Sequence, residues 1–334
     1  MLYSYKYNKR NMKPASNPTI QIAEATRPAN LDFQPITLND LPRIYAILRN
    51  NTTRSCDFTL GGIYMWIDYF GYEYAIVDNT LFIKGLSEDA ARQTSFTVPV
   101  GRMPLSEAVE TVRQYCRANN LEPLFSAVPE SMVEPLQQLG ATAVSELPDW
   151  ADYIYNASDL ATLTGKRYNK KRNHVNRFMA DNPDWHLDMI DDTNLDELSA
   201  FFSTLDIESA KADPAMAEFE RQQTAEVIRN YHRYPFVGGI LRDQHGSIVA
   251  FTIGEIYGDT LILHIEKMRH DVAGAGESIN KLFAAEMLRQ RPELRYINRE
   301  DDAGDPGLRY AKESYHPAYL LKKFNVMMYI SPPK

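Results

Sequence analysis

Cysteine is scarce in this sequence of 334 residues, in which Cys56 and Cys116 are the only two. Two cysteines are too few for a disulfide framework, and they do not have the spacing of a structural zinc site. The sequence therefore indicates a protein of a reducing compartment, and we expect a cytoplasmic location and no metal centre.

Long apolar runs are missing as well. No stretch approaches the roughly 20 apolar residues that cross a bilayer, so we expect no integral membrane segment. The first thirty residues are polar and lack the apolar centre of a secretion signal. We interpret residues 1–30 as a flexible tail ahead of the folded domains.

Positive charge is in deficit, because 36 Lys and Arg residues face 44 Asp and Glu residues, which gives a formal net charge of -8. Non-specific nucleic-acid binding needs many phosphate contacts, and an acidic surface weakens them. This balance excludes general nucleic-acid binding and still allows a local anion site.

The segment 165–178 departs from the acidic balance, because it contains many cations and no carboxylate. Its polar side chains of interest are Lys166, Arg167, Tyr168, Lys170, Lys171, Arg172, Asn173 and Arg177. The apolar spacing predicts a helix that Gly165 splits into two pieces, with Lys166, Lys170, Asn173 and Arg177 in one stripe. Clustered like charges repel one another, so the stripe indicates an anionic visitor, a phosphate or a carboxylate. The alternative interpretation is an ordinary solvated helix face.

The chain after the tail repeats one plan of secondary structure. The first half contains a hairpin turning at Asp78-Asn79, and the second half contains a meander turning at His245-Gly246 and Gly258-Asp259. Each half follows the order strand, helix, antiparallel meander, helix, strand, helix. We therefore predict an α+β fold of two tandem domains, residues 31–155 and 156–334, each a mixed, mostly antiparallel sheet flanked by helices. The cationic segment should lie at or beside their junction, where clefts commonly form.

Polar residues interrupt an apolar strand at 261–268. Side chains alternate along a strand, so His264 and Glu266 are predicted to share one face and Lys267 to point the other way. A carboxyl group buried among apolar neighbours has a raised pKa, which suits Glu266 to general-base catalysis. The alternative is a hydrogen-bonded structural histidine beside a salt-bridged glutamate.

The next predicted strand ends in a polar loop, a frequent place for functional residues. Alternation puts Tyr296, Asn298 and Glu300 on one face. Farther on, Arg309 and Lys312 lie one helical turn apart, ahead of Tyr315. These two cations either bind an anion or pair with the nearby acids.

Metal binding and serine catalysis are weaker interpretations of these residues. His264, Glu266, Glu300 and Asp301 include nitrogen and oxygen ligands, but Lys267 and Arg299 beside them favour an ion-pair network. No Gly-x-Ser-x-Gly elbow surrounds any serine.

The motifs of the second half point to a known family. They are GKRYNKKRNHVNRF, LHIEKM, YINREDD and GLRYAKESYHP. Together they resemble the uncharacterised bacterial family related to the C-terminal domain of phosphatidylglycerol lysyltransferase. The duplicated order of elements resembles the acetyltransferase-like GNAT fold and tandem acyltransferases of the Fem type.

This resemblance implies a transferase that moves an activated acyl group, from aminoacyl-tRNA or an acyl-coenzyme A, to an amine or hydroxyl acceptor. No cofactor other than such a donor is implied. The expected catalytic residues are Glu266 as base, with His264, Asn298 and Tyr315. The expected phosphate-binding residues are the cationic segment, Lys166, Arg167, Tyr168, Lys170, Lys171, Arg172, Asn173 and Arg177, together with Arg299, Arg309 and Lys312.

One departure and two rival functions accompany this interpretation. Asp271 precedes Gly274-Ala275-Gly276, where acetyltransferases usually carry Arg or Gln, and a carboxylate there repels a pyrophosphate. A non-catalytic module that binds a phosphorylated or carboxylated small ligand explains Asp271 equally well. An RNA-binding protein would need aromatic side chains interleaved with the basic stripe, and only Tyr168 is close.

Overall fold

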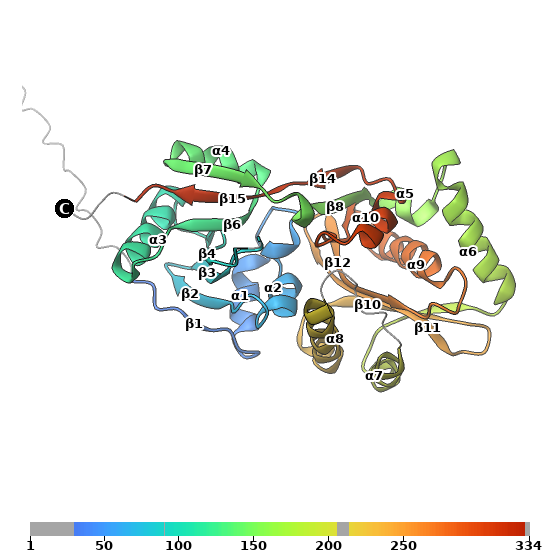
Figure 1. Ribbon diagram of the computed structural model, residues 1–334. Helices are drawn as coiled ribbons and strands as arrows, with labels where there is room; N and C mark the ends of the chain where they lie inside the picture. Colours follow the sequence, from blue (N-terminus) through green and yellow to red (C-terminus); the bar gives the residue numbers. More distant parts are fainter. Residues whose placement is uncertain (1–29, 90, 206–213, 331–334) are drawn as a thin grey trace, which may run out of the picture.

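Two lobes lie side by side in the computed structural model, which describes residues 30–89, 91–205 and 214–330 (Figure 1). Each lobe is built on one sheet with helices packed against it. The predicted α+β class is therefore confirmed. The predicted tail, apart from Asn30, lies outside the described residues.

The first lobe contains the elements from β1 to β7. They are β1 (Gln34–Pro35), α1 (Leu41–Leu48), the 3-10 helix η1 (Cys56–Phe58), α2 (Leu60–Trp66), β2 (Glu73–Val77), β3 (Thr80–Leu86), β4 (Thr94–Phe96), β5 (Val100–Gly101), α3 (Leu105–Asn119), β6 (Leu124–Pro129), α4 (Glu130–Gln138) and β7 (Ala141–Glu146). A further 3-10 helix, η2 (Pro148–Trp150), leads to the second lobe.

The second lobe contains the elements that follow. They are β8 (Asp152–Asn156), α5 (Ala157–Thr162), η3 (Lys166–Tyr168), α6 (Asn169–Asp181), β9 (His186–Met189), α7 (Leu195–Thr204), α8 (Pro214–Arg229), η4 (Tyr231–Arg233), β10 (Val237–Arg242), β11 (Ile248–Tyr257), β12 (Thr260–Met268), α9 (Ala275–Gln290), β13 (Tyr296–Asn298), α10 (Pro306–Glu313) and β14 (Tyr319–Leu321). The chain then returns to the first lobe with β15 (Lys323–Met328).

The two sheets divide the chain differently from the predicted boundary between residues 155 and 156. The second sheet has the order β14-β8-β13-β12-β11-β10-β9, so it already includes β8, which spans that boundary. The first sheet has the order β1-β2-β3-β4-β6-β15-β7, with β5 paired to β3, so it includes β15 from the end of the chain. The strand β15 thus lies between β6 and β7 and pairs with both. Local sequence patterns do not reveal such a long-range pairing.

Local signals predicted several elements correctly. The hairpin between β2 and β3 turns at Asp78 and Asn79, whose φ angles of 47° and 53° fit a type I′ turn. Gly165 has a φ of 101° and lies between α5 and the short η3–α6 helical segment, as the sequence predicted. Both meander turns, after β10 and after β11, also lie where expected.

One hydrophobic core is shared between the lobes. It joins residues of α1 and α2, such as Ile44 and Ile63, to residues of the second sheet, such as Phe251 and Ile265. A separate core lies on the other face of the second sheet, under α5, α6 and α9. The central strands of the second sheet are therefore covered on both faces, by α2, α7 and α8 on one and by α5, α6 and α9 on the other.

The cationic helix α6 lies at the end of the second lobe that is farthest from the first lobe (Figure 1). The prediction that it borders the junction of the lobes is therefore wrong in space, although α6 is close to the junction along the chain. Within the described ranges, no helix combines the length and the apolar character that membrane crossing requires.

Candidate active site

The strands β12 and β13 pair for a short distance and then separate. Thr260, Leu261 and Ile262 pair in parallel with residues 296–298, after which β13 ends while β12 continues to Met268. The chain beyond β13 turns at Glu300, whose φ is 57°. Three of the predicted catalytic residues, His264, Glu266 and Asn298, lie on these two strands, and the fourth, Tyr315, follows α10.

A β-bulge separates the two polar residues of β12. Ile253 of β11 pairs with Ile265, and the next residue, Gly254, pairs with Leu263, so His264 has no cross-strand partner. Leu263 packs in the core under α9, whereas Ile265 packs in the shared core. The bulge thus interrupts the alternation of side chains, and the prediction that His264 and Glu266 share one face is wrong.

Glu266 points toward the α6 and α9 side of the sheet. Its Oε1 accepts a hydrogen bond from Nη2 of Arg299 at 2.8 Å, and its Oε2 accepts one from Nδ2 of Asn280 at 3.2 Å. The Arg299 guanidinium lies 4.9 Å from the centre of the Tyr315 ring. Burial raises the pKa of the Tyr315 phenol. Of the four predicted catalytic residues, Glu266 and Tyr315 are therefore neighbours.

Lys171 connects the cationic helix to this group. Its Nζ lies 4.1 Å from the centre of the Tyr315 ring and 3.5 Å from Oε1 of Glu277, the acidic residue in the first turn of α9. Burial lowers the pKa of Lys171, against the attraction of Glu277. The structure thus brings one cation of α6 next to Tyr315, Arg299 and Glu266, as the sequence interpretation required.

His264 points toward the first lobe. Nε2 lies 2.9 Å from Oε1 of Glu255, and Nδ1 lies 2.6 Å from Oε1 of Glu300. Burial disfavours the charged imidazole, but the hydrogen bonds that the ring donates to Glu255 and Glu300 outweigh it and raise the pKa of His264 to about 10. The ring is consequently an imidazolium at neutral pH with no free nitrogen lone pair, so it holds the two carboxylates together and does not act as a base.

A close approach of the lobes explains a glycine beside this histidine. A Cβ added at Gly61 would lie 2.4 Å from Nε2 of His264, and the Gly61 backbone N–H donates to Oε1 of Glu255 at 2.6 Å. Only glycine fits where α2 meets the imidazolium.

Asn298 also lies on the face toward the first lobe. Its Nδ2 donates to the carbonyl oxygen of Arg54 at 2.6 Å and to Oδ2 of Asp152 at 2.8 Å, while its Oδ1 accepts from the backbone N–H of Glu300 at 2.6 Å. Asn298 therefore fixes the turn after β13 and connects the lobes. It does not lie beside Glu266, so the predicted catalytic quartet is split between the two faces of the sheet.

The two predicted cations of α10 are already engaged. Arg309 pairs with both oxygens of Asp302, at 2.6 and 2.8 Å, and with Asp149 at 2.8 Å. Lys312 is buried, and its ammonium donates to the carbonyl oxygens of Arg299, at 2.6 Å, and of Asp301. Of the two interpretations of Arg309 and Lys312, the structure supports internal pairing with acids and carbonyl groups, not a free anion site.

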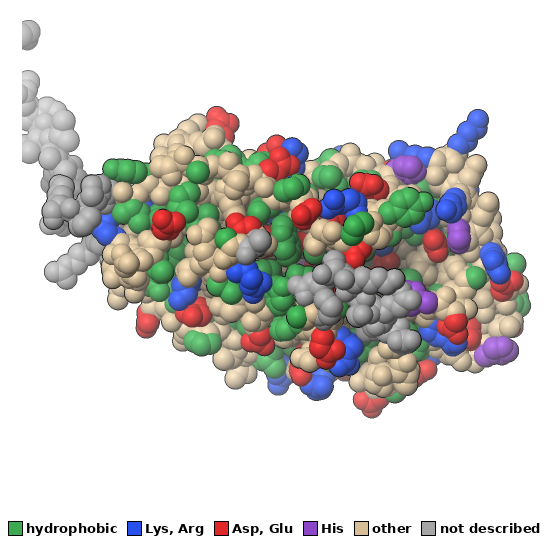
Figure 2. All heavy atoms as spheres, in the orientation of Figure 1, with side chains coloured by type: hydrophobic (Ala, Val, Ile, Leu, Met, Phe, Trp, Pro, Cys, Tyr) green, Lys and Arg blue, Asp and Glu red, His purple; other side chains and the backbone are tan. Residues whose placement is uncertain are grey.

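The cations of the segment 165–178 divide into engaged and exposed side chains. Arg167 pairs with Asp159 at 3.0 Å, and Arg172 donates to the carbonyl oxygens of Leu163 and Gly165. Tyr168, predicted to contact a ligand, is fully buried in the core. The exposed stripe is the predicted one, Lys166, Lys170, Asn173 and Arg177. Figure 2 shows Lys and Arg side chains gathered at that end of the molecule, over α6.

A buried ion cluster between the lobes escaped the sequence interpretation. The Nζ of Lys323, which is fully buried, lies 2.7 Å from Oδ2 of Asp57, 2.8 Å from Oδ1 of Asp152 and 3.7 Å from Oδ2 of Asp301. Cys56, Asp152 and Asp301 have ligand atoms close enough together for a metal ion, but the ammonium of Lys323 lies against all three. The one available signal was a lysine at the start of an apolar strand, 323–328.

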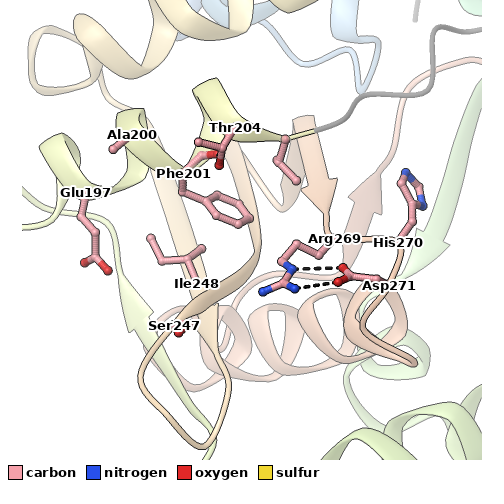
Figure 3. A pocket seen from close by; sticks show the side chains of 10 residues that line it. Glu197, Ala200, Phe201, Thr204, Ser247, Ile248, Arg269, His270 and Asp271 are labelled. Atoms are coloured by element: carbon pink, nitrogen blue, oxygen red, sulfur yellow. Dashed lines mark hydrogen bonds and ion pairs between the residues drawn. The ribbon is translucent and has the colours of Figure 1, made fainter.

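A wide surface cleft of about 850 Å³ lies away from these residues, between α7, the β10–β11 hairpin and the loop before α9 (Figure 3). Phe201, Ile248 and Arg269 line it. Arg269 is neutralised by Asp271 through two hydrogen bonds, at 2.6 and 3.0 Å. The arginine of this loop is thus already paired with the carboxylate of Asp271.

Solved structures with a similar fold are described first. The chain is similar to FemX, with 8% identity, a TM-score of 0.54, and coverage of 89% of this chain and 98% of that chain. A C-terminal domain of a putative lysylphosphatidylglycerol synthetase from Agrobacterium fabrum gives 13% identity and a TM-score of 0.60 over 86% of this chain and 91% of that one. The chain therefore shares its fold with FemX and with this synthetase domain.

The family follows from the sequence itself. The profile of the family described as phosphatidylglycerol lysyltransferase, C-terminal, matches residues 49–327, so the chain belongs to this family. A conserved protein of unknown function from Bacteroides thetaiotaomicron is 31% identical, with a TM-score of 0.78 over 90% of this chain and 100% of that one. The chain spans 55% of the length of a curated relative, an uncharacterized protein of Mycoplasmoides gallisepticum that is 22% identical over 176 residues.

Proposed function

We propose that this protein is an acyltransferase that moves an activated acyl or aminoacyl group to an amine or hydroxyl acceptor, with Glu266 as the general base. The description of its family names a lysyl transfer to phosphatidylglycerol, and we carry over only the chemical class of that reaction. The proposed donor is an aminoacyl-tRNA or an acyl-coenzyme A.

One observation carries the proposal. Lys171 of α6 contacts the Tyr315 ring, that ring contacts Arg299, and Arg299 holds Glu266 at 2.8 Å. A donor whose phosphates lie along the exposed stripe of α6 would therefore have its acyl end within reach of Glu266. The side chains between them are positively charged, which suits a reaction that develops negative charge on a carbonyl oxygen.

The chemistry assigns a separate task to each side chain. Glu266 takes the proton from the acceptor nitrogen or oxygen as that atom forms a bond to the acyl carbon. The bond from the acyl carbon to the donor oxygen or sulfur then breaks, and the proton passes to that leaving atom. Arg299 and Lys171 stabilise the oxyanion of the tetrahedral intermediate, and Tyr315 keeps both cations in place through its ring.

The first test is turnover by Glu266→Gln, with Glu286→Gln on the outer face of α9 as the matched control. Purified protein is incubated with a mixture of aminoacyl-tRNAs or acyl-coenzyme A esters and amine acceptors, and acylated products are identified by mass spectrometry. We expect the Glu266 variant to lose about 100-fold or more in kcat with little change in donor affinity. Equal turnover by wild type and both variants would refute the assignment of the base.

The second test is donor binding to α6. The double variant Lys170→Glu and Arg177→Glu reverses two exposed charges of the stripe, and Arg221→Glu with Arg229→Glu makes the same charge change on α8. We expect isothermal titration with aminoacyl-tRNA or coenzyme A to show weaker, less salt-dependent binding for the α6 variant alone. An equal loss of donor affinity in both double variants would show that the α6 stripe acts only through the overall charge of the protein.

A specific observation also favours the rival function, a binding module without turnover. Glu266 and Arg299 neutralise each other, so the proposed base and the proposed oxyanion stabiliser are already paired. Arg269, in the loop before α9, is likewise paired with Asp271. A module of this kind would bind a phosphorylated or carboxylated ligand and give no product with any donor. In that case Glu266→Gln would change affinity alone, which separates the two functions in the same assay.

A further inference from the structure

The close packing of α6 on the start of α9 largely encloses one lysine (Figure 1). A Cβ added at Gly274, just before α9, would lie 2.3 Å from the carbonyl oxygen of His174 in α6, so glycine permits this approach. Lys171 of α6 lies against α9, with 15% of its side chain exposed. Its Nζ is 3.5 Å from Oε1 of Glu277 and 4.1 Å from the centre of the Tyr315 ring. The side chain is thus mostly enclosed but not sealed from solvent.

A second cation shares the Tyr315 ring with Lys171, because the Arg299 guanidinium lies 4.9 Å from the centre of that ring. Burial is the main cause that lowers the pKa of Lys171, and the nearby charges of Arg299 and Lys170 lower it further. The carboxylate of Glu277 opposes this change without reversing it. A lower pKa leaves more of the amine neutral, and the neutral amine is the nucleophile.

Within the part of the chain that the structure describes, two lysines have a lowered pKa, Lys171 and Lys312. The ammonium of Lys312 donates to the carbonyl oxygens of Arg299 and Asp301, and the residue is 7% exposed. Lys171 instead contacts one carboxylate at 3.5 Å and one aromatic ring, so its nitrogen is less engaged. Lys171 is therefore the described lysine that combines a lowered pKa with a side chain open to reagents.

We propose that Lys171 is a modification site whose amine is acylated by small anionic acyl donors, with acyl phosphates as the chemical class. The exposed Lys170 and the rest of the α6 stripe attract such anions to the helix. The ammonium first gives a proton to water, and the amine nitrogen then forms a bond to the acyl carbon. The bond from that carbon to the phosphate oxygen breaks, and phosphate leaves with the electron pair and takes up the second proton that the nitrogen loses. An acyl-coenzyme A offers the same acyl chemistry with a thiolate as the leaving group.

Acylation replaces the Lys171 cation by a neutral amide. The amide no longer forms the ion pair with Glu277, and it no longer supplies the positive charge that the proposed transfer reaction uses. Modification would therefore switch the proposed reaction off. The inference goes beyond the proposed function and is tested separately from it, because acylation is measured on the protein itself, without acceptor or turnover.

The test is a time course of acetylation of the full chain with acetyl phosphate and, in a separate arm, with acetyl-coenzyme A at the same concentration. Peptide mass spectrometry gives the acetylated fraction of each lysine. We expect Lys171 to react at least about threefold faster than Lys170, its exposed neighbour on α6, because more of the Lys171 amine is neutral. The faster donor identifies the source of the acyl group. In concentrated urea, where the surroundings of Lys171 are lost, the two lysines should react at equal rates.

Two variants test the electrostatic cause, and their expected effects have opposite signs. Glu277→Gln removes the carboxylate that favours the charged ammonium, so Lys171 should be acetylated about twofold faster or more. Arg299→Gln removes a neighbouring cation and leaves the Glu266 carboxylate unpaired, so Lys171 should be acetylated about twofold more slowly or less. Glu286→Gln, farther along α9, is the control and should react like wild type.

Circular dichroism shows whether each variant is folded, and the comparison of Lys171 with Lys170 in the wild-type chain needs no variant at all. The proposal would be overturned if neither donor acetylated Lys171 faster than Lys170 in the folded chain. A rate difference that persisted in urea, or a folded Glu277→Gln variant that reacted no faster than wild type, would equally overturn it.

Discussion

His264 and Glu266 are two residues apart in β12, yet their side chains lie on opposite faces of the second sheet. The bulge at His264 causes this separation, and each residue belongs to a different polar group. Glu266 joins Arg299, Tyr315 and Lys171 on the side of α6. His264 joins the acids between the lobes, where it has a structural role.

The structural role of His264 predicts a pH-dependent stability. Its folded pKa of about 10 exceeds the usual value of 6.5, so its contribution is complete below pH 6.5 and is lost as the pH rises through 10. We expect His264→Gln to cost at most about 5 kcal/mol at pH 6, and less at pH 10. Urea unfolding at both pH values measures the difference. His186→Gln, at an exposed histidine, should show no comparable trend.

Two adjacent lysines provide a matched comparison of buried and exposed charge. Lys323→Met leaves Asp57 and Asp152 without their buried cation, so we expect a loss of about 3–5 kcal/mol in the free energy of unfolding. Lys322→Met removes only a surface pair with Glu146, which should cost less than about 1 kcal/mol. Similar losses for both variants in chemical denaturation would contradict the importance of the buried cluster.

Asp301 predicts a second loss of stability with rising pH, over a lower pH range than that of His264. Burial raises its pKa to about 7 from 3.8, despite Lys323 and Lys312, so its stabilising contribution is lost as the pH rises from 3.8 through 7. Asp301→Asn has no carboxyl group to titrate at this position, so it lacks this pH dependence of stability. We expect the stability of this variant relative to wild type to improve between pH 4 and pH 8 by up to about 4 kcal/mol. Asp184→Asn is the exposed control, and a flat difference for Asp301→Asn would refute the assignment.

The contact between α6 and Tyr315 predicts a difference between neighbouring lysines. Lys171→Ala removes a half-buried ammonium from the Tyr315 ring and from Glu277, so we expect a loss of about 1–2 kcal/mol in thermal unfolding. Lys170→Ala, at an exposed position, should change stability by less than about 0.5 kcal/mol. For anion affinity we expect the reverse order. Lys170→Ala should weaken anion binding more than Lys171→Ala, because the Lys170 ammonium is exposed and can contact the anion.

Sequence predicted what depends on neighbours along the chain. The turn at Asp78-Asn79, the break at Gly165 and the exposed stripe of α6 all follow from local residue preferences. The bulge at His264 depends on the register between β11 and β12, which no local pattern encodes. The same holds for Lys323, whose carboxylate partners come from η1, β8 and the loop after β13. The strand predicted to carry Tyr296, Asn298 and Glu300 ends at Asn298, and Glu300 lies in the turn that follows. The hydrogen-bond partners of these residues could not be inferred from the sequence.

The position of β15 has a consequence for the order of folding. The first sheet is complete only when residues 323–328 pair with both β6 and β7, nearly two hundred residues after β6 in the chain. During synthesis on the ribosome, the edges of β6 and β7 that pair with β15 stay unpaired until residues 323–328 emerge. The first half should therefore become resistant to proteases only once residues 323–328 are available, whereas the second sheet lacks only its edge strand β14 once residues 296–298 are available.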